Sequence, residues 1–206
     1  TLYDCNDSNN GKGIITHAAS TTSYTGCGVK VTGGTFNMYG GTISDNKVTE
    51  HGGGVYVENS YNSIKGNVSG TFNMYGGTIS GNKASADHGR GGGVYVYNST
   101  FNMTDGEITG NTAYYGGGVG LTSYAVFHMD GGTIRANSLN NQYSVNGGGV
   151  WVDNGCSFIV SGNATVGGNK DYSNNDNNVE LASGQTITIA GKLAGSIGVY
   201  TYDTPA

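Results

Sequence analysis

The 206-residue sequence is poor in charge and proline, and it contains no long hydrophobic run. Only 11% of its residues are charged, and 39 glycines stand against one proline, so neither a charge-rich disordered chain nor a collagen-like triplet repeat fits. Nine scattered Lys and Arg and a net charge of −5 argue against nucleic acid as a partner. No apolar stretch approaches the roughly 18 residues of a spanning helix, so we expect no membrane insertion.

Much of the abundant glycine falls in two repeated strings. The first is clearest at 72–82, Phe-Asn-Met-Tyr-Gly-Gly-Thr-Ile-Ser-Gly-Asn, and begins again at Phe36, Phe101, Phe127 and, more faintly, Phe158. The second, Gly-Gly-Gly-Val-x-Val/Leu, lies at 52–57, 91–96, 116–121 and 147–152. The leading Phe residues are 36, 29, 26 and 31 residues apart. Periods this short are typical of a solenoid, in which each repeat buries its apolar face against its neighbours.

Apolar and polar residues alternate within each repeat, which predicts three short strands per repeat and no helix. Such repeats predict an all-β chain folded as a parallel β-helix, or β-solenoid, of about six coils. We expect the interior to contain columns of equivalent residues. These are Phe36, Phe72, Phe101, Phe127 and Phe158; Met38, Met74, Met103 and Met129; and Ile43, Ile79, Ile108, Ile134 and Val166.

An asparagine closes each copy of the first string, at Asn46, Asn82, Asn111, Asn137 and Asn169. Asparagine tolerates a positive φ, and its amide can bond to the same amide one coil away. We therefore interpret this column as a stacked bend of structural importance.

The repeats divide the chain into three regions. Residues 1–25 are rich in turn formers and predict an N-terminal cap or partial coil, 26–200 predict the β-helix, and 201–206 predict a linker. The coils are longest at 58–70 and 139–146, where loops leave the stack and function often lies.

Three cysteines are present. Coils about 4.8 Å apart would put Cys27 and Cys156 roughly 19 Å from each other, beyond the ~7 Å Cα limit of a disulfide. We expect a Cys5–Cys27 disulfide, with three buried free thiols as the alternative.

The two strings resemble the repeats of bacterial surface and secreted proteins of the right-handed parallel β-helix (pectin-lyase-like) superfamily. They are also similar to the GGAI and FxxN repeats of polymorphic outer-membrane proteins and other autotransporter-like adhesins. The resemblance covers about residues 26–200 and implies a right-handed β-helix module of a larger exported protein, at the cell surface or outside the cell. It implies no particular activity, since that superfamily contains both enzymes and adhesins.

An aromatic column is the leading candidate for a binding surface. In the Gly-Gly-Gly-Val strand the residue between two inward apolar residues faces out, which predicts an outward column of Lys30, Tyr56, Tyr95, Gly120 and Trp151. Tyr97 continues this face. Exposed rings about 4.8 Å apart suit a sugar ring or a protein partner. Ordinary sheet surface is the alternative, because Tyr is also a good strand residue.

Catalytic and metal-binding candidates are few. Asp105 and Asp130 lie near the same turn of adjacent coils, with Glu107 and Arg135 beyond them, but we interpret the aspartates as turn formers and the other two as an exposed ion pair.

Two further groups offer metal ligands. They are Glu50-His51 with Asp87-His88 and Arg90, and the alternating Asp171, Ser173, Asn175 and Asn177. We interpret the first group as solvated loop residues and do not favour calcium at the second, which lacks the turn glycine at its sixth place, so we expect no metal and no cofactor.

The sequence therefore favours a non-catalytic extracellular interaction or scaffold module of a bacterial surface protein, adhesin-like, whose partner is a host or environmental glycan or protein surface. The alternatives are a subunit that associates end to end into an extracellular fibre, and a polysaccharide lyase or glycoside hydrolase.

Overall fold

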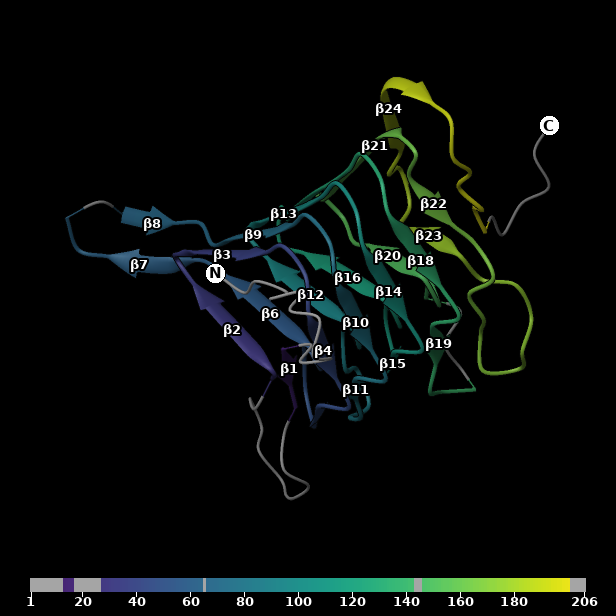
Figure 1. Cartoon of the computed structure of the whole chain (residues 1–206), viewed down its shortest axis with the longest axis horizontal. Helices are drawn as coiled ribbons and strands as arrows, with labels where there is room; N and C mark the ends of the chain where they lie inside the picture. Colours follow the sequence, from purple (N-terminus) through teal and green to yellow (C-terminus); the bar gives the residue numbers. More distant parts are fainter. Residues whose placement is uncertain (1–12, 17–26, 65, 143–145, 201–206) are drawn as a thin grey trace, which may run out of the picture.

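The chain winds into a stack of coils with parallel strands on its sides (Figure 1). The structure, a computed structural model, describes residues 13–16, 27–64, 66–142 and 146–200. All regular secondary structure in these ranges is β-strand, and equivalent strands of about six successive coils pair in parallel. The prediction of an all-β parallel β-helix is confirmed.

Four sheets, named A to D here, form the sides of the solenoid. Sheet A contains β3 (Thr35–Met38), β9 (Thr71–Met74), β13 (Thr100–Met103), β17 (Val126–Met129), β21 (Ser157–Gly162) and β24 (Ile187–Leu193). Sheet B contains β1 (Ile14–Ile15), β4 (Thr42–Ser44), β10 (Thr78–Ser80), β14 (Glu107–Thr109), β18 (Thr133–Arg135) and β22 (Thr165–Val166).

Sheet C contains β2 (Val29–Thr32), β6 (Val55–Glu58), β12 (Val94–Tyr97), β16 (Val119–Thr122), β20 (Val150–Val152) and β23 (Val179–Leu181). Sheet D contains β5 (Lys47–Val48), β11 (Lys83–Ala84), β15 (Thr112–Ala113) and β19 (Ser138–Leu139). A coil therefore runs through C, A, B and D in turn. Sequence alternation predicted the strands of C, A and B. It missed the strands of D, because two residues are too few to show a period.

The predicted inner columns form the core. The Phe rings stack from coil to coil with centroids 5.2, 4.8, 4.5 and 5.0 Å apart, and the Met and Ile columns are fully buried. This continuous apolar interior is the main source of stability, because each coil removes apolar surface from water only against its neighbours.

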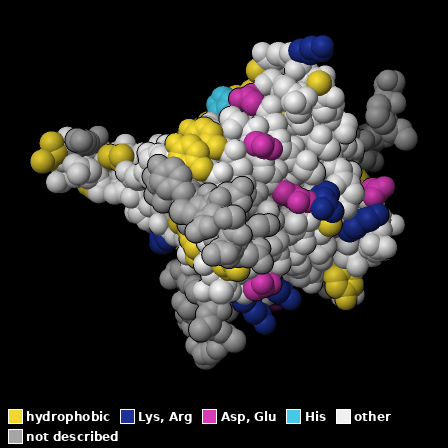
Figure 2. Space-filling view, viewed as in Figure 1, with side chains coloured by type: hydrophobic (Ala, Val, Ile, Leu, Met, Phe, Trp, Pro, Cys, Tyr) yellow, Lys and Arg dark blue, Asp and Glu magenta, His cyan; other side chains and the backbone are white. Residues whose placement is uncertain are grey.

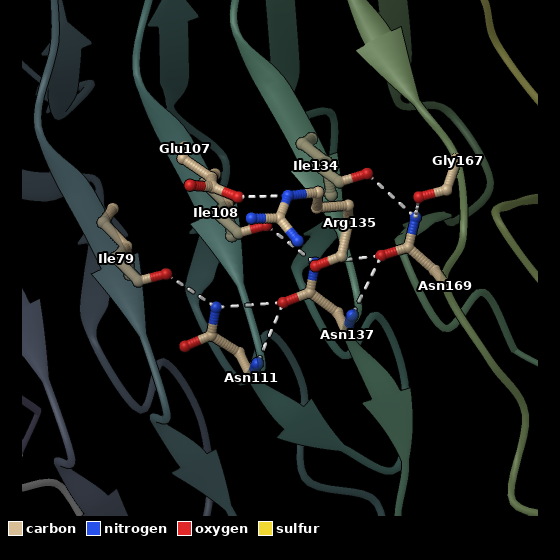
Figure 3. Close-up of polar contacts among 9 residues, drawn as sticks. All are labelled: Ile79, Glu107, Ile108, Asn111, Ile134, Arg135, Asn137, Gly167 and Asn169. Carbon is tan, nitrogen blue, oxygen red and sulfur yellow. Dashed lines mark hydrogen bonds and ion pairs between the residues drawn. The ribbon is translucent and has the colours of Figure 1, made fainter.

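The asparagine column is a buried amide ladder (Figure 3). The Oδ1 of Asn111 accepts from both the backbone N and the Nδ2 of Asn82, and Asn137 and Asn169 continue the pattern. Asn178 closes the ladder by accepting from Asn169. The predicted amide stacking is confirmed.

The expectation of a positive φ at these asparagines is wrong. The left-handed residue of each bend is the one before the asparagine, at Asp45, Gly81, Gly110, Ala136 and Gly168. The asparagine side chain must point inward to make the ladder, so the preceding residue makes the turn.

The long insertion at 58–70 contains an antiparallel hairpin, β7 (Ser60–Asn62) and β8 (Gly66–Val68), which projects from the stack (Figure 1). Figure 2 shows hydrophobic side chains at the tip of this hairpin. Of the predicted cap, only 13–16 fall among the described residues, and β1 there pairs with β4. Cys5 and the predicted linker 201–206 lie outside the described residues, so the Cys5–Cys27 disulfide stays a prediction.

Candidate functional site

The predicted aromatic column on the outer side of sheet C has the expected register but not the expected exposure. Tyr56 pairs with Tyr95, Tyr95 with Gly120, and Gly120 with Trp151. Tyr95 is only 3% exposed and Trp151 only 8% exposed, whereas Tyr56 is half-buried and Tyr97 is 40% exposed. The prediction that this column forms an exposed strip is therefore wrong for Tyr95 and Trp151.

Residues from the loops before the glycine triplets cover these rings. The His51 ring packs on Tyr95 with centroids 4.7 Å apart, and Tyr115 packs on Trp151 at 4.5 Å. The Arg90 guanidinium lies 5.8 Å from the Trp151 centroid, and the Arg90 Cβ lies 3.5 Å from where a Cβ on Gly120 would stand. Arg90 thus occupies the gap that Gly120 leaves in the column.

Hydrogen bonds and burial set the protonation states in this covered layer. Burial, reinforced by the Arg90 cation, lowers the pKa of His51. The Arg90 backbone N–H lies 3.3 Å from Nδ1 of His51, and Arg90 Nη1 lies 3.5 Å from Nε2. A neutral imidazole can accept a hydrogen bond at one of these nitrogens and an imidazolium at neither, so the arrangement disfavours the protonated ring.

Glu58, at the neighbouring end of sheet C, binds Lys30 and Thr32 of the adjacent strand β2. Burial alone would raise the pKa of Glu58, but hydrogen bonds from Lys30, Thr32 and Tyr56 outweigh it and lower the pKa. Burial and the bond to Glu58 raise the pKa of Tyr56. The layer therefore combines stacked rings with hydrogen-bonded polar groups on the outer side of sheet C.

The candidate metal ligands are not brought together. His51 packs on Tyr95, whereas His88 packs on Tyr114 and Tyr115. Across the described ranges, no three His, Cys, Asp or Glu side chains gather in a group suited to a metal.

The possible calcium loop is bonded within itself. Both carboxylate oxygens of Asp171 accept from Asn175, at 2.8 and 3.0 Å. Asn177 is buried and its Oδ1 accepts from the Gly148 N–H. The candidate oxygen ligands of this loop, those of Asp171 and Asn177, are therefore directed at different protein groups.

Of the two acidic candidates, Asp105 bonds within its own turn, as the sequence interpretation expected, whereas Asp130 bonds to the next coil. Asp105 Oδ1 accepts from the N–H of Gly106 at 2.7 Å within the turn, and Asp130 Oδ1 accepts from the Ser161 hydroxyl. Glu107 and Arg135 form an ion pair (Figure 3).

The aromatic pair that is exposed lies elsewhere, at the corner where sheet A turns into sheet B. Tyr39 and Tyr75 are 48% and 42% exposed, and their rings stack with centroids 4.8 Å apart and planes within 14°. They follow the outward asparagines Asn37 and Asn73, whose amides bond at 2.8 Å. Sequence reasoning missed this pair, although alternation carried one step past Met38 and Met74 would have placed both rings outside.

Comparison with protein-family models, curated proteins and solved structures found no match to this chain. In the part of the chain that the structure describes, no helix has the length and apolar character needed to cross a membrane.

Proposed function

We propose that this chain is a non-catalytic extracellular interaction module of a bacterial surface protein, adhesin-like, which binds a glycan at the corner where sheet A turns into sheet B. The observation that carries the proposal is the exposed Tyr39–Tyr75 stack. Aromatic faces with nearby amides and hydroxyls bind sugars well, because a sugar ring has both C–H faces and hydroxyl edges.

The rigidity of the surroundings supports this proposal. Tyr39 and Tyr75 directly follow the paired strands β3 and β9, next to the fully buried Met38 and Met74, and the amide ladder Asn37–Asn73–Asn102 runs beside them. A preformed surface loses little conformational entropy on binding, which favours affinity. The extracellular location rests on the resemblance of the repeats to those of surface proteins.

A glycan array tests the proposal, followed by titration of the best ligand against Tyr39→Ser/Tyr75→Ser. We expect at least a tenfold loss of affinity, about 1.4 kcal/mol, with an unchanged circular-dichroism spectrum. Tyr172→Ser is the matched control, because Tyr172 is also exposed, at 56%, but lies on the 171–176 loop. Retained affinity in the double variant, or attachment only to protein ligands, would contradict the proposal.

Stacking end to end into a fibre is a second candidate, favoured by the C-terminal end of the solenoid. Ile189 pairs with Val160 in the inner column, yet it is 63% exposed while Val160 is fully buried. Its strand, β24, is the edge of sheet A, and an apolar edge strand is a template for pairing with another chain. Electron microscopy should then show rods that disappear with Ile189→Lys; isolated particles at high concentration would refute it.

Polysaccharide cleavage is the remaining alternative from the sequence. Assays for reducing ends and unsaturated products on a panel of polysaccharides test it directly.

A further inference from the structure

The tyrosine stack ends abruptly at the third coil. Backbone bonds of 2.8 to 2.9 Å from Tyr75 to Met38, from Thr104 to Met74 and from Asp130 to Met103 place Tyr39, Tyr75, Thr104 and Asp130 on successive steps of one outward column. A much smaller side chain therefore stands where a third ring would continue the stack.

The result is an open position that we call the Thr104 notch, bounded by Tyr75, Thr104, Asp105 and Asp130. Tyr39 stacks on one face of the Tyr75 ring, and Thr104 follows Tyr75 in the column on the side opposite Tyr39. Thr104, Asp105 and Asp130 are all exposed, so the notch is open to solvent. Tyr75 and Asp130 are two steps apart, about 9.6 Å at the usual strand spacing.

We propose that the Thr104 notch holds one pyranose ring of a neutral glycan, stacked on Tyr75 in the place of a third tyrosine. This inference rests on the proposed function and specifies its ligand. A ring stacked 4.8 Å from Tyr75, as Tyr39 is, lies midway between Tyr75 and Asp130. The weakly positive C–H groups of a pyranose face suit the negative face of an aromatic ring.

Two carboxylates, Asp105 and Asp130, supply the polar half of the site. Ser161 bonds to Oδ1 of Asp130, which leaves Oδ2 to accept from a sugar hydroxyl. Asp105 stands next to Thr104, and an ionised carboxylate accepts hydrogen bonds without donating any. Arg135, a cation of the adjoining sheet B, is paired with Glu107. The notch therefore recognises hydroxyl donors and repels uronic or sulfated sugars.

The experiment is calorimetric titration of the whole chain with matched hexasaccharides of glucose, mannose, galactose and galacturonic acid, repeated with Thr104→Tyr. This substitution installs the residue that the first two coils carry at this step, so it should fold normally while filling the notch. We expect at least one neutral hexasaccharide to bind tenfold tighter than the galacturonic one, and Thr104→Tyr to weaken it at least tenfold. Thr109→Tyr, on the outer side of sheet B, is the control and should bind as the unmodified chain does.

The outcomes separate the two proposals. If a glycan binds through Tyr39 and Tyr75 but Thr104→Tyr binds it equally well, the notch is wrong and the proposed function stands. Tighter binding of the galacturonic hexasaccharide would also overturn the notch. If no glycan binds the unmodified chain, both proposals fail. Should Thr104→Tyr not fold, Asp130→Asn serves instead, with neutral binding weakened several-fold and the discrimination against galacturonic acid reduced; unchanged binding in that variant counts against the notch.

Discussion

The buried amide ladder predicts that Asn111→Ala is among the most destabilising substitutions in the chain. Asn111 is fully buried. Its side chain accepts from the N and Nδ2 of Asn82, both at 2.9 Å, and donates to Ile79 O at 2.9 Å and to Asn137 Oδ1 at 3.0 Å. Alanine removes all four bonds. Because the site is fully buried, water does not replace the lost amide, and its former partners stay unpaired there.

The magnitude follows from the number of bonds. At about 1 kcal/mol net for each hydrogen bond, four lost bonds cost about 4 kcal/mol. A typical domain has about 5–15 kcal/mol of stability in total, so the loss is a large fraction of it. For a chain of this length we expect a fall in melting temperature of about 8–16 °C.

Asn73→Ala is the matched control for this prediction. Asn73 belongs to the outer amide ladder, is half-buried, and makes one bond of 2.8 Å to each neighbouring asparagine. Water can replace these bonds, so we expect a cost below about 1 kcal/mol.

Asn111→Asp tests the direction of the ladder. The new carboxylate would face two acceptors, Ile79 O and Asn137 Oδ1, in a buried site. Its pKa should therefore lie above the usual value of about 3.9, and the folded state should lose stability as the pH rises through that raised pKa.

Guanidinium unfolding followed by circular dichroism measures all three variants. A cost of Asn111→Ala no greater than that of Asn73→Ala would refute the reasoning. So would an Asn111→Asp variant that is equally stable at pH 4 and pH 7.

Three further predictions concern the outer layer and the corners. The lowered pKa of His51 means that the unfolded chain binds the proton more readily, so stability should fall as the pH drops below about 6.5. Thermal unfolding between pH 7.5 and 5 should show this slope, and His51→Gln should reduce it. Gly120→Ala should destabilise the fold and shift Trp151 fluorescence to the red, because the new Cβ would lie 2.9 Å from a backbone nitrogen and crowd Arg90 off the indole; an unchanged spectrum would contradict this. Tyr124 has a φ of 63°, which costs a non-glycine residue roughly 1–2 kcal/mol, so Tyr124→Asn should raise the denaturation midpoint, and a lower midpoint would show that the exposed ring stabilises its turn.

The sequence alone determined the strands of sheets A, B and C and the contents of the core. Alternation of period two places Phe72 and Met74 on one side of a strand and Asn73 on the other, and repetition of the string places equivalent residues one above another. The amide ladder followed for the same reason, since a repeated bend stacks identical side chains. These are local or periodic properties, and a single sequence displays them directly.

Only the tertiary structure decided which outward residues are exposed. Tyr95 and Tyr75 both face away from the interior, yet Tyr95 is buried under His51 and Tyr75 is 42% exposed. Alternation separates inside from outside within one strand, but cover on the outer face comes from loops of neighbouring coils whose lengths differ. Sequence alternation could not predict the cover at Gly120 either, because the gap there is filled by Arg90 from the preceding coil. Exposure is set by contacts between residues far apart in the chain, and the spacing within one repeat carries no record of them.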